Sequence, residues 1–273
     1  MIKTDHIQEQ ENSVSNAFSA QSSKFDSITT SNPMEVIYRN IVREHVLEYT
    51  KVGQSMLELN CGTGLDAVFF AENKLHVHAT DNSEGMLEQL KQKVQNFKLE
   101  DHISFQKCSF NEISAVNSEK KFDHVFSNFG GLNCADDLSL VIKQLDDKIK
   151  KDGIAHFVMI APICFWEWMA VFKGRFNYAF RRLRKKGARS HVEGHYFITY
   201  YYSASYIKKA FGQNYEVVKS RSLGCFMPPT FKETFPAKWP KLFSVLKNIE
   251  LTVNTLWPFN RVGDLYIISL KKR

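Results

Sequence analysis

The sequence lacks the features of a secreted, disulfide-linked or zinc-binding protein. Its five cysteines are odd in number and irregularly spaced, which argues against a disulfide framework or a zinc site and for a reducing compartment. Residues 1–21 are polar and contain no apolar run of the kind that forms a secretory signal. We therefore expect a cytoplasmic protein.

The sequence also lacks an uninterrupted membrane span. Residues 154–172 approach the necessary length, but His156, Pro162 and Glu167 interrupt them. A spanning helix needs about 20 consecutive apolar residues. We interpret the first half of this stretch as a buried strand.

The length and composition fit one large domain with elaborations. The chain has 273 residues, of which 44% are hydrophobic, so it can bury a sizeable core. Residues 1–16 are polar and show no periodicity. We expect a disordered tail there, followed by a single domain over residues 17–273.

Residues 56–70, MLELNCGTGLDAVFF, predict a buried strand, a tight turn and a helix. Gly62 and Gly64 lack a β-carbon, so the turn can bring backbone amides against a ligand at the start of the helix. Glu58 adds a negative charge beside this turn, which argues against a phosphate and for a cationic or amine-bearing ligand. The dinucleotide pattern GxGxxG is not matched, because Ala67 stands three residues after Gly64.

The segment LELNCGTG resembles the first motif of the class I S-adenosylmethionine-dependent methyltransferases, an acidic residue followed by xGxGxG. Asn60 stands where that family usually has its first glycine, and asparagine adopts left-handed backbone conformations more readily than most residues. The resemblance implies that S-adenosylmethionine is the cofactor. It also implies that the turn contacts this cofactor through Glu58, Asn60, Cys61, Gly62 and Gly64.

A second anchor for a nucleoside lies downstream. Residues 75–80 alternate as a strand and place Asp81 at its carboxyl end, about 20 residues beyond the glycine turn, where a carboxylate can accept the two hydroxyls of a ribose. Asn82 follows at the same strand end, and Ser83 is expected to cap the next helix. Met86, in its first turn, matches the position at which the family often packs an apolar side chain on the adenine.

The loops after the third and fourth predicted strands supply the remaining cofactor candidates. Ser109 stands where related methyltransferases commonly have an acidic residue that bonds the adenine amino group, and Phe110 can stack on the ring. Asn128 ends the fourth strand, in the loop that lies between cofactor and substrate in the family. It either contacts the cofactor or forms the turn.

Strands alternate with helices over residues 56–160, which predicts right-handed crossovers and a parallel sheet with ligands beyond its carboxyl ends. Residues 215–223 and 263–273 are predicted to be the last two strands. The resemblance implies a Rossmann-like, doubly wound α/β fold with seven strands, mostly parallel with an antiparallel last strand.

A helical N-terminal segment is expected before this core. A helix is predicted over residues 34–49, opened by Ser31, Asn32 and Pro33. In methyltransferases of this type an N-terminal helix often closes over the cofactor, which would place Phe18, Phe25 or Arg39 near it. Ordinary packing and surface roles are the alternative.

Two segments, about residues 161–195 and 225–260, are expected to form substrate-cap insertions. The first is dense in aromatic side chains and carries eight lysines and arginines, with no acidic residue between Glu167 and Glu193. Such a cap suits a large lipophilic or aromatic substrate, and its basic run suits an acidic group or an anionic membrane surface. A solvated basic helix beside an aromatic core is the alternative. Nucleic acid is disfavoured, because the basic residues are confined to one segment without a recognised binding motif.

The second insertion contains an apolar stripe at helical spacing, which we expect to pack against the first insertion and to wall a lipophilic pocket with it. Its members are Leu242, Val245, Leu246, Ile249 and Val253.

His191 and His195 precede a strand-like segment, residues 196–202, that should return the chain to the sheet. An imidazole there can act as general base when the methyl acceptor is a hydroxyl or an activated carbon. The sequence therefore predicts an S-adenosylmethionine-dependent methyltransferase of a small lipophilic or aromatic metabolite, with no metal ion. The alternatives are a carbon methyltransferase of a quinone-like ring and a non-catalytic module that binds a partner or the inner face of a membrane.

Overall fold

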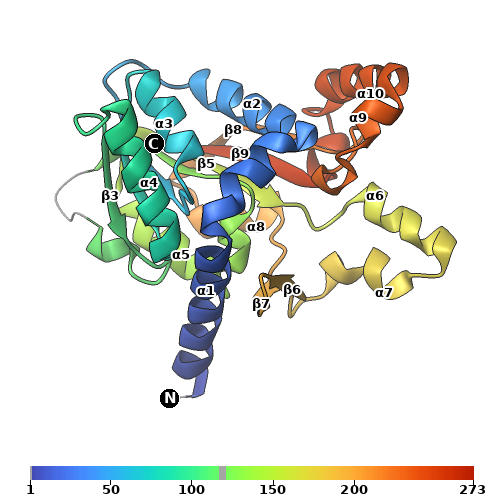
Figure 1. The fold of residues 1–273 in the computed structure, drawn as a ribbon, viewed down its shortest axis with the longest axis horizontal. Coiled ribbons are helices and arrows are strands. Elements are labelled where there is room, and N and C mark those ends of the chain that lie inside the picture. Colours follow the sequence, from blue (N-terminus) through green and yellow to red (C-terminus); the bar gives the residue numbers. More distant parts are fainter. Residues whose placement is uncertain (1, 117–120) are drawn as a thin grey trace.

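A seven-stranded sheet forms the centre of the molecule (Figure 1). The computed structural model describes residues 2–116 and 121–273. In order across the sheet, the strands are β3 (Ile103–Lys107), β2 (His76–Asp81), β1 (Ser55–Leu59), β4 (Phe122–Ser127), β5 (Ile149–Ile160), β9 (Leu265–Lys272) and β8 (Tyr215–Leu223). The first five in this order are parallel, and β9 pairs antiparallel with both β5 and β8. The predicted Rossmann-like fold with an antiparallel last strand is confirmed.

Helices cover both faces of the sheet, each burying an apolar stripe on it. One face carries α2 (Pro33–Leu47), α3 (Leu65–Glu72) and α4 (Glu84–Phe97). The other carries α5 (Leu138–Asp146) and α8 (Ala204–Phe211). Because the central strands are buried on both sides, Met56, Leu57 and Leu59 of β1 are all buried, and Glu58 near the carboxyl end of the strand is buried among them.

Side-chain caps fix where two of these helices begin. The Asn32 side chain accepts the backbone N–H groups of Met34 and Glu35 at the start of α2. Ser83 accepts the backbone N–H of Met86 at the start of α4. The sequence predicted both positions, because Asn and Ser at a helix start satisfy amides that the helix itself leaves unpaired.

The N-terminal segment is helical, which differs from the predicted disordered tail of residues 1–16. Helix α1 runs over Ile2–Ser31, and Met1 lies outside the described residues. Contacts with the rest of the chain hold this polar helix: Ala17 is fully buried, and the Gln10 side chain exchanges two hydrogen bonds with the backbone of Ile198, at 2.7 and 2.9 Å. Tertiary packing thus overrides the weak local signal.

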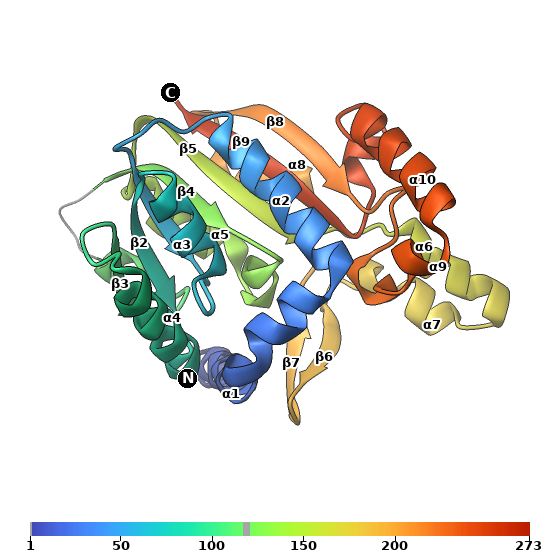
Figure 2. The ribbon, with the colours of Figure 1, turned by 45° about the horizontal axis from the view of Figure 1, so that its top comes forward.

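The segment predicted to rejoin the sheet forms a separate ribbon instead. Strand β7 (His195–Thr199) pairs antiparallel with β6 (Ala188–Val192), beside α1 (Figure 2). Glu193 and Gly194 make the connecting turn with positive φ angles of 46° and 82°, which reverses the chain before it can reach the sheet.

The two insertions lie side by side at one end of the molecule (Figures 1 and 2). The first contains α6 (Phe165–Trp168) and α7 (Phe176–Ala179), and the second contains α9 (Phe235–Lys238) and α10 (Pro240–Val253). They touch through the rings of Trp166 and Phe235, whose centroids are 5.9 Å apart. In the described part of the chain, every helix is too short or too polar to cross a bilayer.

A buried ion network anchors the first insertion to the sheet. Arg182 pairs with Glu167 and with Asp264, at 2.7 Å each, and also donates to the backbone carbonyls of Ala161 and Asp264. Arg182 and Glu167 are both buried, so removing either partner would leave a charge without compensation.

The apolar stripe of α10 does not pack against the first insertion as predicted. Leu242, Val245 and Ile249 are exposed. The buried side of the helix is set instead by Glu250, whose carboxylate accepts the four consecutive backbone N–H groups of residues 224–227.

Candidate functional site

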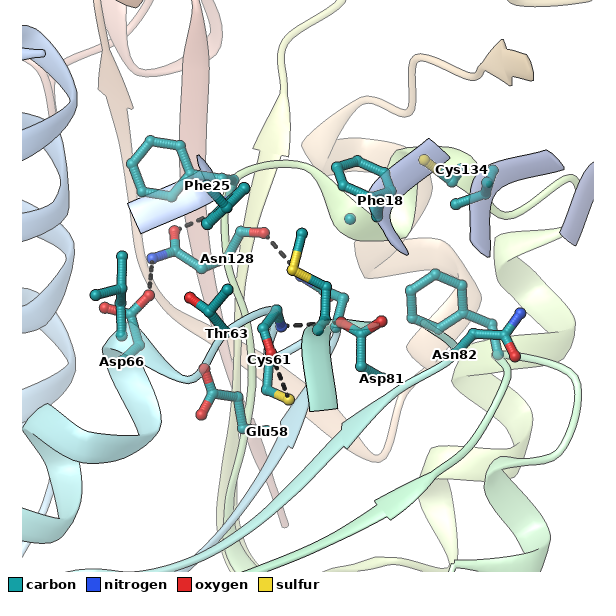
Figure 3. A pocket seen from close by; sticks show the side chains of 18 of the residues that line it. Phe18, Phe25, Glu58, Cys61, Thr63, Asp66, Asp81, Asn82, Asn128 and Cys134 are labelled. Atoms are coloured by element: carbon teal, nitrogen blue, oxygen red, sulfur yellow. Dashed lines mark hydrogen bonds between the residues drawn. The ribbon is translucent and has the colours of Figure 1, made fainter. Parts of the chain in front are cut away.

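A pocket opens beyond the carboxyl ends of β1 and β4, where the strand order of the parallel sheet reverses (Figure 3). It brings together most of the residues that the sequence predicted for cofactor binding. The predicted residues that line it are Glu58, Asn60, Cys61, Gly62, Asp81, Asn82, Met86, Phe110 and Asn128. Two predicted residues, Gly64 and Ser109, lie next to lining residues in the chain and are not themselves part of the wall.

The turn after β1 has the left-handed geometry that its sequence suggested. Asn60, Gly62 and Gly64 have φ angles of 45°, 56° and 82°. The Asn60 side chain joins the ends of two strands: its oxygen accepts the Ser127 hydroxyl at 2.6 Å, and its amide donates to the Asn128 carbonyl at 3.0 Å. Asparagine therefore replaces the expected glycine without loss of the turn, and it adds a tie to β4.

Gly64 acts through packing. A β-carbon on this residue would lie 2.3 Å from Cδ1 of Leu90 in α4. The glycine thus allows α4 to approach the turn closely, which explains its place beside the pocket rather than in its wall.

Asp81 is fixed in place by the same turn. One carboxylate oxygen accepts the backbone N–H of Gly62 at 2.9 Å, and the other accepts that of Ser83 at 2.8 Å. Burial raises the pKa of the Asp81 carboxyl. A carboxylate has about four acceptor positions, so each oxygen retains capacity for a ligand hydroxyl.

Two buried polar atoms of residues that line this pocket have no partner in the described part of the chain. Glu58 is 2% exposed, and its Oε2 makes no hydrogen bond within the described residues. The buried Nε of Arg39 is likewise unpaired there. Both side chains line the pocket. An unpaired acid and an unpaired guanidinium donor in one wall fit a ligand that carries an ammonium and a carboxylate.

Neighbouring charges distinguish the two acids of this wall. Burial raises the pKa of the Glu58 carboxyl well above its ordinary value, and Asp66 adds to the rise. Burial also opposes ionisation of Asp66, but Arg39 and Arg43 hold the pKa of its carboxyl below its ordinary value. Asp66 pairs with both arginines and accepts the Asn128 amide at 2.8 Å. Asp66 is therefore the anion of the resting site, while Glu58 favours its neutral form.

Comparisons with known proteins agree with this arrangement. Residues 56–153 match the family model of a methyltransferase domain. The core of this chain has the Rossmann-like α/β fold of methyltransferases. A search of curated proteins found no match.

Solved structures resemble the fold along most of the chain. The [4+2]-cyclase SpnF is 13% identical, with 95% of this chain and 94% of that chain covered and a TM-score of 0.62. A protein from Listeria monocytogenes described as an S-adenosylmethionine-dependent methyltransferase is 16% identical, with 86% and 98% covered and a TM-score of 0.58. DhpI, in a complex with SAM and HEP, is 14% identical, with 97% of each chain covered and a TM-score of 0.57. At these identities the likeness concerns the fold.

The matched core of the methyltransferase domain runs from β1 into β5, so α1 and both insertions lie outside it. Domains of this class use S-adenosylmethionine. Its amino-acid end carries an ammonium and a carboxylate, and its ribose carries two hydroxyls. Glu58, Arg39 and Asp81 offer groups of matching sign and type in one pocket.

Helix α1 covers the pocket of the methyltransferase domain. Phe18 and Phe25 reach over it from α1, on the side opposite Glu58 (Figure 3). The sequence left open whether Phe18, Phe25 and Arg39 lie near the cofactor site or have ordinary packing and surface roles. All three line the pocket. Within the described residues, neither of the insertions expected to cap the substrate lines this pocket, and its cover comes from α1.

Hydrogen bonds tie α1 to both loops that shape the pocket. Ser15 donates to the Asn82 carbonyl at 2.9 Å, and Ser19 and Ser83 share a hydrogen bond of 2.8 Å. Asp26 accepts the Thr63 hydroxyl at 2.5 Å and pairs with Lys93 at 2.5 Å. The small residues Ser15, Ser19 and Ser22 recur at helical spacing and signal a close helix contact. This spacing can be seen in the sequence itself.

Glu11 is a lining residue that the sequence analysis missed. It lies in the segment predicted to be disordered, and its carboxylate accepts the Asn111 amide at 2.7 Å, beside Ser109 and Phe110. Burial raises the pKa of the Glu11 carboxyl. Glu11 of α1 thus brings a carboxylate to the loop after β3. In this loop the chain has Ser109 where related methyltransferases commonly have an acidic residue.

The predicted catalytic histidines do not reach the pocket. His191 and His195 lie on the β6–β7 ribbon near its turn, and neither lines the pocket. His191 is exposed, with its ring 4.5 Å from that of Tyr196. The prediction assumed that this segment returned to the central sheet, and the separate ribbon removes that premise. Neither His nor Lys occurs among the described lining residues.

The three lining thiols are neutral. Burial raises the pKa of Cys108 and that of Cys134 to about 12, and it raises that of Cys61 well above its ordinary value. They therefore act as small apolar wall residues rather than as nucleophiles.

Proposed function

We propose that this protein transfers a methyl group from S-adenosylmethionine to a small lipophilic or aromatic metabolite. The observation that carries the proposal is that Oε2 of Glu58 and Nε of Arg39, which have no hydrogen-bond partner among the described residues, belong to side chains in the same wall as Asp81. An acid, a guanidinium donor and a fixed carboxylate match the three polar parts of this cofactor: ammonium, carboxylate and ribose.

Each polar group has an assigned role in holding the cofactor. Glu58 would accept the ammonium, Arg39 would donate to the carboxylate, and Asp81 would accept the ribose hydroxyls. When bound, the cofactor supplies an electrophilic methyl group on a sulfonium sulfur.

The adenine of the cofactor would lie in the part of the pocket lined by Met86 and Phe110. Met86 and Phe110 provide apolar surface for the ring. Glu11, which accepts the Asn111 amide, would accept its amino group, in the role that the family gives to an acid at the position of Ser109.

The chain contributes to the transfer by positioning and by excluding water. Methyl transfer is an in-line displacement that gains most from a fixed approach of the acceptor. Helix α1 closes one side of the pocket, and the described wall offers carboxylates rather than imidazoles as proton acceptors. This supports an acceptor that needs little help with deprotonation, such as an amine or an ionised phenol.

The character of the wall supports a lipophilic substrate. Phe18, Phe25 and Phe129 line the pocket with Val14 and Leu65. Aromatic rings offer large apolar surfaces and favour ring-shaped partners. A carbon acceptor on a quinone-like ring remains the alternative of the same class.

Methyl transfer is tested separately from cofactor binding. The protein is incubated with methyl-labelled S-adenosylmethionine and a panel of lipophilic phenols, amines and quinols, and products are identified by mass. A product one methyl group heavier is the expected result. Binding of S-adenosylhomocysteine without transfer to any lipophilic acceptor or to a host metabolite extract would favour a non-catalytic module. The similarity to the cyclase SpnF makes this control necessary, because the fold alone does not imply transfer.

A further inference from the structure

The two insertions lie at the end of the molecule away from β3 (Figure 1). Both carry exposed apolar side chains. Phe172, between α6 and α7, is 90% exposed, and Trp257, after α10, is 74% exposed. Large apolar side chains are costly to leave in water when they gather on one segment, and such patches mark interaction sites.

Helix α10 adds an ordered apolar stripe to these side chains. Leu242, Val245 and Ile249 recur at helical spacing and are all exposed. The buried Glu250 fixes the rotation of the helix, because its carboxylate accepts four backbone N–H groups at 2.6 to 3.3 Å. The stripe is therefore held outward by a rigid contact.

The same two segments hold all of the chain's net positive charge. Residues 161–195 and 225–260 together contain twelve Lys and Arg against four Asp and Glu, a net charge of +8, while the whole chain has +7. The rest of the chain is thus at −1. Several of these cations are exposed and make no ion pair within the described residues: Lys173, Arg175, Lys185, Lys186, Lys238 and Lys241.

We propose that the two insertions form a docking surface for an anionic phospholipid bilayer. Apolar side chains would enter the interface while the lysines and arginines meet anionic headgroups, which is the combination that gives peripheral binding without a spanning helix. A second copy of the chain is a poorer occupant, because it would bring +8 against +8. Nucleic acid would use the cations but would leave the outward stripe of α10 in water.

This surface is independent of the proposed catalysis, since no insertion residue lines the described pocket. If both proposals hold, the protein can take a lipophilic substrate from the membrane to which it is bound.

Cosedimentation with vesicles tests the proposal. The full chain is mixed with vesicles of phosphatidylcholine alone or with added phosphatidylglycerol, in low and in high salt. Sedimentation with the anionic vesicles, weakened but not abolished by salt, is expected, since salt screens the cations and leaves the apolar contact. A protein that stays in the supernatant with anionic vesicles at low salt overturns the proposal.

Matched variants separate the two contributions. Phe172→Ser with Trp257→Ser should weaken binding about tenfold or more, and Lys185→Glu with Lys186→Glu should weaken it mainly at low salt. Phe97→Ser, an exposed aromatic of α4 outside the insertions, is the control and should bind like the wild type. Binding unchanged in both double variants would contradict the proposal. So would binding to an anionic oligonucleotide as tight as that to vesicles and unaffected by the apolar variant. Circular dichroism of each variant confirms that it is folded.

Discussion

The Asp81 carboxylate accepts the backbone N–H of Gly62 at 2.9 Å, which joins the end of β2 to the turn after β1. Its second oxygen holds the start of α4 through Ser83. The acid proposed to bind the ribose is therefore also the residue that fixes the two loops around it. Ligand affinity and the shape of the turn should respond together when it is changed.

Glu58 should make cofactor binding depend on pH. Its raised pKa favours the neutral acid in the free protein, whereas an ammonium beside it favours the carboxylate. Binding should therefore release a proton below that pKa, and affinity for S-adenosylhomocysteine should rise as the pH increases toward it. Calorimetry in two buffers of different ionisation heat measures the release. Glu58→Gln should bind more weakly and without proton release, and a variant that releases the same number of protons as the wild type would exclude Glu58 as their source.

Gly64→Ala should lower the free energy of unfolding by about 2 to 4 kcal/mol, because the new β-carbon meets Leu90 and the backbone is left-handed. Gly62→Ala is the matched comparison: its φ is also positive, but its β-carbon would have no atom nearer than 4.0 Å, so a loss of about 1 kcal/mol is expected. Denaturant unfolding measures both. Equal losses in the two variants would show that crowding against Leu90 contributes nothing.

A buried histidine chain should make stability fall in acid. His45 bonds Ser269, which bonds His156, which in turn bonds His124. Burial lowers the pKa of His45 and of His124 to about 4, from 6.5. The folded state thus binds fewer protons than the unfolded state in this range. The stability that the two neutral histidines contribute is therefore complete above about pH 6.5 and is lost as the pH falls toward 4.

The expected loss between about pH 7.5 and about pH 4.5 is about 2 to 5 kcal/mol in denaturant unfolding. Carboxylates also titrate in this range, so His124→Gln is the control. The free energy of unfolding of this variant should vary less with pH than that of the wild type. An identical pH profile would mean that groups other than His124 cause the loss of stability in acid.

Asp26→Ala should loosen α1 over the pocket. Asp26 joins Thr63 of the turn to Lys93 of α4. Amide hydrogen exchange in α1 should become several-fold faster, for a lost interaction of about 1 kcal/mol. Lys24→Ala breaks the exposed pair with Glu193 and should change exchange little. Unchanged exchange in Asp26→Ala would mean that the other contacts of α1 suffice to hold it.

The core of this fold could be predicted from sequence because its signals are local. The strand, turn and helix around Gly62, the acid at Asp81 and the cap at Ser83 each have a short-range pattern with a physical reason. Asn60 could also be accepted in the turn, since its own backbone preference allows the left-handed geometry.

The remaining features depend on contacts distant in the sequence. Helix α1 is polar and is held by residues such as Ile198, so its own composition suggested disorder. The position of Glu11 beside Asn111 follows only from that docking. The outward face of α10 is set by Glu250 and the amides of residues 224–227, and its apolar periodicity alone does not say which side is buried.

The central claim is that this pocket binds the adenosyl and amino-acid parts of S-adenosylmethionine. Calorimetric titration of the folded protein with S-adenosylhomocysteine tests it most directly, in the wild type, in Asp81→Ala and in the control Asp101→Ala, which removes an exposed carboxylate. Saturable binding at one site in the wild type and in the control is expected, with affinity about tenfold or more weaker in Asp81→Ala. No binding by the folded wild type, or equal affinity in Asp81→Ala, would contradict the claim.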